Sequence, residues 1–78
     1  MPPRQLKIGK KIKELREYLQ KDQKEFSKIL NLKQPTISQW ENGARFPHSA
    51  GIKNLVRLAQ HCTPPFPLSY EDFYRNGD

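Results

Sequence analysis

Cysteine and long apolar runs are almost absent from this sequence, and each absence excludes a class of protein. Because Cys62 is the one cysteine, the chain cannot close an internal disulfide, and its composition does not point to secretion. No apolar run approaches the roughly 20 residues that a membrane-spanning helix needs, and the N-terminus lacks the apolar stretch of a signal peptide. We therefore expect a cytoplasmic protein that does not enter a membrane.

Acidic residues are also scarce, and the charge is unevenly distributed. The chain has 14 Lys and Arg but only 8 Asp and Glu, which gives a net charge of +6. Basic residues outnumber acidic ones by eight to three in residues 1–24 and by five to two in residues 25–62, whereas acidic residues lead by three to one in residues 63–78. A basic body with an acidic tail suggests a polyanionic partner for the body, although a solvated lysine-rich surface explains the charge equally well.

The sequence lacks a cluster of catalytic or metal-binding side chains. His48 and His61 are 13 positions apart and have no cysteine or acidic residue at ligand spacing, so we expect no metal site. The serines, histidines and acidic residues are scattered, and no nucleophile, base and orienting group come together in the pattern. We expect neither an enzyme nor a bound cofactor.

What the sequence does contain is the apolar spacing of short helices. After a polar arm at residues 1–5, four apolar residues spaced +4, +3 and +4 predict a helix over residues 6–19: Ile8, Ile12, Leu15 and Leu19. Asp22, followed three positions later by Glu25, is typical of a capping box and predicts a second helix over residues 23–30.

Residues 31–43 continue the second helix into a turn and a third helix. Asn31 tolerates the left-handed conformation that ends a helix, and Leu32 can anchor the turn in the core. Proline is tolerated in the first turn of a helix, so Pro35 places the start of the third helix near Gln34. The pair Asn42-Gly43 is a stop signal, which predicts a helix over residues 34–42.

The third helix has two different faces. Ile37 and Trp40 give it a buried side, and the other side carries amides and hydroxyls, namely Gln34, Thr36, Ser38 and Gln39. These groups can read base edges, since Gln binds adenine bidentately and the Thr methyl can contact the methyl group of thymine. A helix, a three-residue turn and this helix together predict a helix-turn-helix.

The remainder of the chain predicts two more helices. Another apolar stripe indicates a helix over residues 49–61 with Ser49 as its N-cap: Ile52, Leu55, Val56 and Ala59. The segment 63–67 holds three prolines and must be a link. Ser69 and Asp72 can cap a last helix over residues 70–75, anchored by Phe73 and ended by Gly77. With no alternation typical of strands, the predicted fold is all-α with five short helices.

Three stretches of the chain resemble a known family. "IGKKIKELR", "DQKEFSKILNLKQPTISQWENG" and the "FP" before the fourth helix are similar to the helix-turn-helix domain shared by lambdoid phage repressors, Cro proteins and the wider xenobiotic-response-element group. The resemblance covers residues 8–62 and implies a lambda-repressor-like DNA-binding domain. It further implies a transcriptional repressor that binds double-stranded DNA, with a palindromic operator occupied by a homodimer.

The resemblance also implies roles for individual residues. The base-facing positions of the third helix are Gln34, Pro35, Thr36 and Gln39. Phosphate contacts are implied for Gln23, which would also brace Gln34, and for Asn42 and Arg45. An ion pair between Arg16 and Glu41 would join the first helix to the third. The chain departs from the family pattern at Lys33, which cannot accept a capping hydrogen bond but can reach a phosphate, and at Pro35, which offers a base only apolar contact.

The tail, residues 63–78, admits two interpretations. Its aromatic residues Tyr70, Phe73 and Tyr74 either cap the core of the domain or form a self-complementary patch, and we favour the patch as a candidate dimer contact. A rival function from another class is an antitoxin-type interaction module whose tail binds a partner protein. The prolines and aromatic residues of the tail keep that alternative open.

Overall fold

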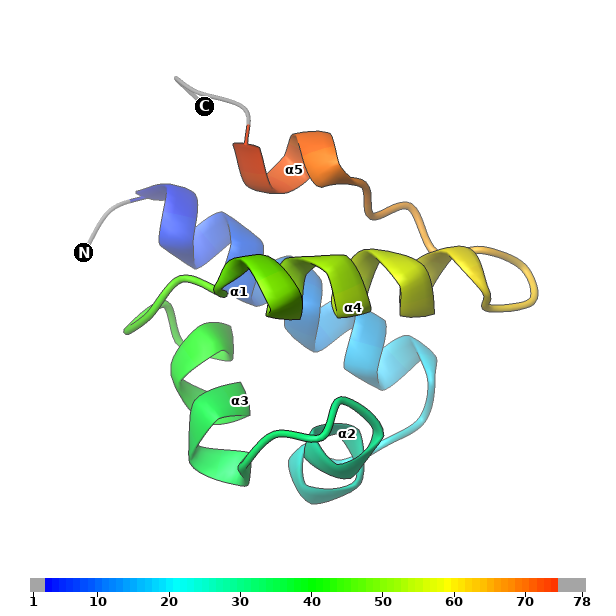
Figure 1. Cartoon of the computed structure of the whole chain (residues 1–78), viewed down its shortest axis with the longest axis horizontal. Coiled ribbons are helices and arrows are strands. Elements are labelled where there is room, and N and C mark those ends of the chain that lie inside the picture. The colour runs from blue at the N-terminus through cyan, green and yellow to red at the C-terminus, as the bar shows by residue number, and fades with distance from the viewer. Residues whose placement is uncertain (1–2, 75–78) are drawn as a thin grey trace.

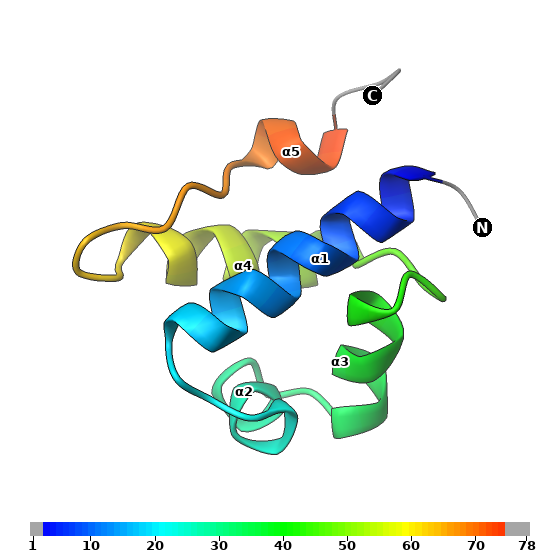
Figure 2. The same ribbon diagram turned by 180° about the vertical axis from the view of Figure 1, so that it is seen from behind.

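The computed structural model describes residues 3–74 of the chain, and it describes side chains from Leu6 onwards. These residues form five helices and no strand, so the predicted all-α fold is confirmed. The helices are α1 (Pro3–Tyr18), α2 (Gln23–Ile29), α3 (Gln34–Glu41), α4 (Ser49–Gln60) and α5 (Tyr70–Tyr74). In Figures 1 and 2, α1 and α4 lie across the middle of the molecule, with α2 and α3 on one side and α5 on the other.

Helix α1 begins earlier than its apolar spacing predicts. Its first residue is Pro3, and proline is favourable in a first turn because no intrahelical N–H is lost there. The predicted loose arm is therefore wrong for residues 3–5, while Met1 and Pro2 lie outside the described residues. Ile8 and Ile12 turn inward from this helix and are buried.

The start and end of α2 follow the local sequence. Asp22 accepts a hydrogen bond from the Glu25 backbone N–H at 2.7 Å, and the Glu25 carboxylate accepts one from the Asp22 N–H at 3.0 Å. Both halves of the predicted capping box are therefore present. After α2, Asn31 has a φ of 57°, the left-handed conformation that the sequence predicted for it.

The cap of α4 differs from the prediction. The N-cap residue is His48, whose ring Nδ1 accepts a hydrogen bond from the Gly51 N–H at 3.0 Å, and Ser49 is the first residue inside the helix. The prediction that Ser49 caps this helix is wrong because a neutral histidine ring can accept through an unprotonated nitrogen, as a hydroxyl does. The apolar stripe of α4 is buried as expected.

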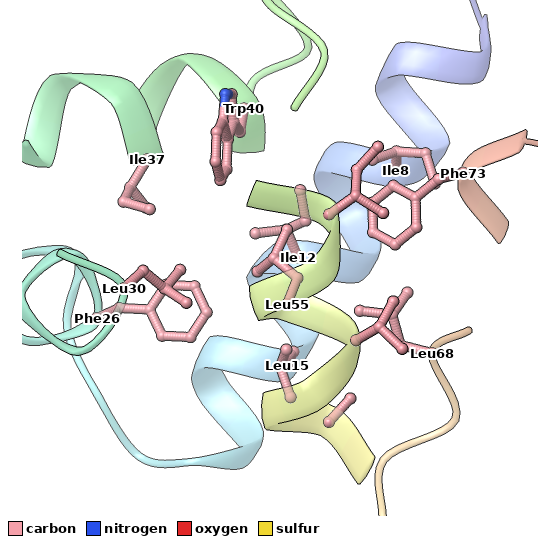
Figure 3. Packing of buried hydrophobic residues seen from close by; sticks show 13 residues of the cluster. Ile8, Ile12, Leu15, Phe26, Leu30, Ile37, Trp40, Leu55, Leu68 and Phe73 are labelled. Carbon is pink, nitrogen blue, oxygen red and sulfur yellow. The ribbon is translucent and has the colours of Figure 1, made fainter. Parts of the chain in front are cut away.

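The core lies where the helices converge. Figure 3 shows Phe26 of α2, Leu30 just after that helix, and Ile37 and Trp40 of α3 directed towards the side chains of α1 and α4. The tail contributes to the same core, because Leu68 and Phe73 are 3% and 0% exposed. The full set of buried apolar residues is Ile8, Ile12, Leu15, Phe26, Leu30, Ile37, Trp40, Ile52, Leu55, Val56, Ala59, Leu68 and Phe73.

The proline-rich link is held against α1. The Tyr18 hydroxyl donates to the Pro64 carbonyl at 2.6 Å, and the Tyr18 and Phe66 rings lie 5.3 Å apart. Lys11 forms an ion pair with Asp72 at 3.2 Å. Burial of Asp72 raises its pKa, but the hydrogen bonds from the Ser69 N–H and from Lys11 outweigh this, so the pKa is lowered below its usual 3.8.

Within residues 3–74, no helix is long and apolar enough to cross a membrane.

Candidate nucleic-acid interface

A tight turn joins α2 to α3 and fixes their relative orientation. The Leu32 N–H donates to the Ser27 carbonyl at 2.8 Å, and the Asn31 N–H donates to the Lys28 carbonyl at 3.1 Å. Leu32 packs against the core, which is the anchoring role that the sequence predicted for it. The turn therefore places α3 beside α2 as a helix-turn-helix requires.

The side chains of α3 divide into a buried set and an exposed set. Ile37 and Trp40 are 0% and 2% exposed and form the inner face. Gln34, Pro35 and Gln39 are exposed, and Thr36 and Ser38 are partly exposed. All four residues predicted to face DNA bases therefore reach solvent from one short helix, as a helix entering the major groove requires.

The first turn of α3 carries no side-chain cap. Lys33 occupies the N-cap position without a capping hydrogen bond, and its exposed side chain is directed to solvent instead. Pro35 lies in this first turn, where a missing N–H is tolerated. An exposed cation is therefore available beside the first base-facing residue.

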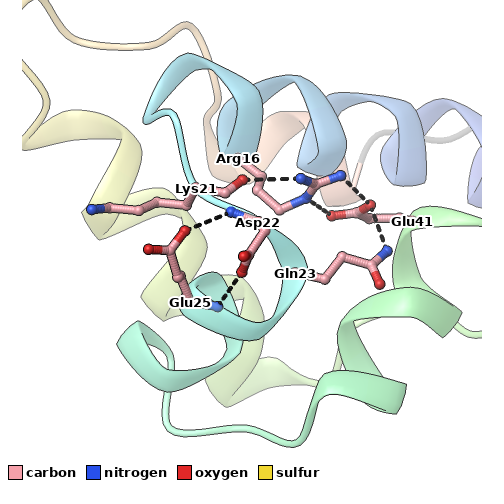
Figure 4. Close-up of polar contacts among 6 residues, drawn as sticks. All are labelled: Arg16, Lys21, Asp22, Gln23, Glu25 and Glu41. Atoms are coloured by element: carbon pink, nitrogen blue, oxygen red, sulfur yellow. Dashed lines mark hydrogen bonds and ion pairs between the residues drawn. The ribbon is translucent and has the colours of Figure 1, made fainter.

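Three helices meet at the carboxylate of Glu41, whose side chain is 5% exposed (Figure 4). Arg16 donates to it twice, from Nε to Oε2 at 2.7 Å and from Nη2 to Oε1 at 3.1 Å, and also donates to the Lys21 carbonyl at 3.0 Å. The hydrogen bond with Glu41 raises the pKa of Arg16 above its already high value, so the guanidinium remains charged. The predicted ion pair between α1 and α3 is present and largely buried.

The same carboxylate holds Gln23, the first residue of α2. Gln23 Nε2 donates to Glu41 Oε1 at 3.1 Å. Among the described residues this amide is bonded to Glu41, and its brace on Gln34 stays a prediction. The stronger acceptor is the buried carboxylate, which binds an N–H more tightly than a neutral amide does. One hydrogen of the Gln23 amide remains available for a phosphate.

A compact loop follows α3. The Asn42 Oδ1 accepts from the Ala44 N–H at 2.8 Å, and the Gln39 carbonyl accepts from the N–H groups of Ala44 and Arg45 at 2.9 and 3.2 Å. Gly43 has a φ of 79°, a conformation that favours glycine. The Asn42 amide nitrogen and the exposed Arg45 side chain remain available at the C-terminal end of α3.

The predicted aromatic patch of the tail is only partly exposed. Phe73 is fully buried and its ring lies 6.3 Å from that of Phe46, so of the two interpretations this residue follows the core one and is not a contact for a partner. Tyr70 and Tyr74 are 46% and 54% exposed. Their role as a dimer contact stays a prediction.

Two glycines near α3 were missed by the sequence reasoning. Gly9 lies inside α1 and Gly51 inside α4, and both are buried. Glycine within a helical pattern is a signal of close packing, which could have identified them.

Within residues 3–74, no three or more His, Cys, Asp or Glu side chains group together as a metal site.

Comparison with known proteins places this geometry in a family. The helix-turn-helix family HTH_3 matches residues 12–62, more than half of the chain. The chain is also 38% identical over 74 residues to the Type II methyltransferase M.SsoII of Shigella sonnei; the match covers 91% of this chain but only 19% of the methyltransferase. No solved structure matches the chain. The chain therefore belongs to the helix-turn-helix family HTH_3, whose members are DNA-binding domains of the Cro and phage-repressor type.

Proposed function

We propose that this protein is a sequence-specific transcriptional repressor that binds a palindromic operator as a homodimer. The observation that carries the proposal is the division of α3, which buries Ile37 and Trp40 while exposing Gln34 and Gln39. A helix whose exposed face consists of amides and a hydroxyl is suited to hydrogen-bonding base edges. By occupying a promoter, the dimer blocks the polymerase.

Base reading falls to the exposed side of α3. Gln34 and Gln39 each pair bidentately with a base, with adenine N6 and N7 as the preferred partner. Thr36 lies between them and offers both a hydroxyl and a methyl group. Pro35 offers apolar contact alone, which suits the methyl group of thymine.

Phosphate contacts flank the reading helix at both ends. Lys33 lies immediately before α3, and Asn42 and Arg45 follow it. Gln23 stands at the start of α2, with its amide oriented by Glu41. Because these groups bind the backbone and not the bases, they set the position of α3 on the duplex and contribute little to sequence choice.

The dimer contact is formed by Tyr70 and Tyr74 of α5. Both rings are exposed, and aromatic side chains are enriched in protein interfaces. Helix α5 lies on the opposite side of α1 and α4 from α2 and α3, so pairing through it leaves both reading helices uncovered. The DNA-binding domains of the two subunits bind half-sites about one helical turn apart.

The test is selection of bound duplexes from a random DNA pool, followed by titration of the selected operator. We expect the selected site to be palindromic. The binding constant should fall steeply as the salt concentration rises, because each neutralised phosphate contributes about −0.9 to the log–log slope. Gln34→Ala and Gln39→Ala should each cost about 1–3 kcal/mol on the operator and little on random DNA. Gln60→Ala, an exposed residue of α4, is the control. A salt-independent affinity, or equal losses on both DNAs, contradicts the proposal.

The similarity to a Type II methyltransferase favours a second candidate function. In that protein the matched segment is a small part of a longer chain, so the same kind of domain occurs together with a methyltransferase. The candidate is a regulator that controls a methyltransferase gene. It predicts that the selected operator occurs upstream of such a gene in the source genome, and an operator found only at unrelated promoters would contradict it.

A further inference from the structure

Two buried glycines lie against residues of the C-terminal turn of α3. Gly9 is in the interior of α1, and Gly51 is in the first turn of α4. Glycine is less favourable than alanine inside a helix, because it gives up more backbone freedom on folding. Its presence at both positions therefore calls for a compensating reason in the packing around it.

Gly9 lies directly against the backbone of α3. A Cβ atom on Gly9 would be 2.5 Å from the carbonyl oxygens of both Trp40 and Glu41, and 2.9 Å from the Glu41 carbonyl carbon. These are main-chain atoms, so no side-chain rotation can relieve the overlap. Any larger residue at position 9 must push the end of α3 away from α1.

Gly51 lies against the side chain of Trp40. A Cβ atom on Gly51 would be 2.5 Å from Cη2 and 3.1 Å from Cζ2 of the indole. The indole is 2% exposed, and the ring of His48 meets it edge-on with 5.6 Å between ring centroids. The ring is therefore enclosed, and it has little room to move aside.

The two ends of α3 are held differently. At its C-terminal end, the backbone contacts Gly9, the Trp40 indole contacts Gly51, and Glu41 is bonded to Arg16. At its N-terminal end, Gln34 and Pro35 are exposed, Lys33 provides no side-chain cap, and the helix is joined to the core through the turn that Leu32 anchors. A displacement imposed at the C-terminal end is therefore carried to the base-facing side chains as a tilt of the whole helix.

We propose that Gly9 and Gly51, the glycine clamp, are positioning residues for sequence recognition: they set the angle of α3 and so determine specificity without contacting DNA. The inference rests on the proposed function of α3 as the reading helix. Recognition groups must be held to within about 0.5 Å of their productive geometry, and an added methyl group at either glycine exceeds that tolerance.

The experiment compares Gly9→Ala with wild type and with Gln60→Ala, a charge-neutral change at an exposed position. Affinity is measured for the selected operator and for a random duplex of equal length, at a temperature where circular dichroism shows every variant folded. We expect the operator-to-random affinity ratio to fall roughly tenfold for Gly9→Ala, about the loss of one good base contact, while Gln60→Ala retains the wild-type ratio.

The ratio separates positioning from stability. If a glycine is needed only for folding, its replacement lowers the affinity for both duplexes equally, because fewer molecules are folded. An unchanged operator-to-random affinity ratio therefore overturns the proposal. If wild type itself binds every duplex equally, the proposed function fails and not the clamp alone. The two failures are therefore distinguishable in one titration series.

A second set of variants decides the question if Gly9→Ala does not fold. The single ring of phenylalanine is shorter than the two-ring indole, whose far end carries the Cη2 atom nearest to Gly51. Trp40→Phe therefore makes space for the methyl group of Gly51→Ala. We expect Gly51→Ala to lower the operator-to-random ratio and the double variant to recover much of that loss, which is a non-additive cycle. A double variant whose loss equals the sum of the two single losses overturns the clamp.

Discussion

Replacing Glu41 by alanine removes a carboxylate that accepts three hydrogen bonds, two from Arg16 and one from Gln23. The Arg16 side chain is only 13% exposed, so its guanidinium would remain largely buried with the Lys21 carbonyl as its remaining acceptor. Loss of one partner of a buried ion pair typically costs about 3–5 kcal/mol, because the other charge is left uncompensated.

For a domain of this size the cost is a large part of the total stability. A chain of 78 residues has a free energy of unfolding of roughly 4–12 kcal/mol at the usual per-residue value. We therefore expect Glu41→Ala to lower the melting temperature by at least about 12 °C, at roughly 4–8 °C per kcal/mol. The single tryptophan, Trp40, is buried and reports unfolding in urea through its fluorescence, with circular dichroism as a second probe.

The chain offers a matched control in its other ion pair. Lys11 and Asp72 are 39% and 30% exposed, and a pair that accessible contributes about 0–1 kcal/mol. Asp72→Asn should therefore shift the urea midpoint much less than Glu41→Ala. The reasoning is refuted if the two variants lose equal stability. It is also refuted if Arg16→Met combined with Glu41→Leu costs the sum of the single changes, since removing both charges should restore part of the loss.

Two further predictions concern the tail. Tyr70→Ser combined with Tyr74→Ser should convert a dimer to a monomer in analytical ultracentrifugation and weaken operator binding while leaving the melting temperature nearly unchanged, because both rings are exposed; a variant that still sediments as a dimer excludes this surface. Because the pKa of Asp72 is lowered in the folded state, its carboxylate stabilises the protein above pH 3.8 and loses that effect as the pH falls below it. Wild type and Asp72→Asn should therefore differ in urea midpoint at neutral pH and converge towards about pH 2, and a difference that persists there contradicts the assignment.

Local signals in the sequence were sufficient to predict most of the helices. The capping box of Asp22, the left-handed Asn31 and the proline in the first turn of α3 each act within a few residues, so the pattern alone locates α2 and α3. The ion pair between Arg16 and Glu41 is different, because it joins residues 25 positions apart. It was expected from the family resemblance and not from spacing.

The features that were missed depend on contacts between distant segments. His48 caps α4 through a ring nitrogen, a role for which histidine has no strong sequence preference. Gln23 binds Glu41 because the fold brings that buried carboxylate next to it. The sequence left open whether Phe73 packs in the core or contacts a partner, and it belongs to the core because the proline-rich link places α5 against α4.

The division of α3 into buried and exposed side chains also bears on how its sequence can change in evolution. Gln34, Pro35 and Gln39 are exposed, so they contribute little to the core that Ile37 and Trp40 complete. Exposed substitutions usually alter stability by no more than about 0.5 kcal/mol. Mutations at these three positions should therefore leave the domain folded, and under the proposed function they would change the target site while retaining the same scaffold.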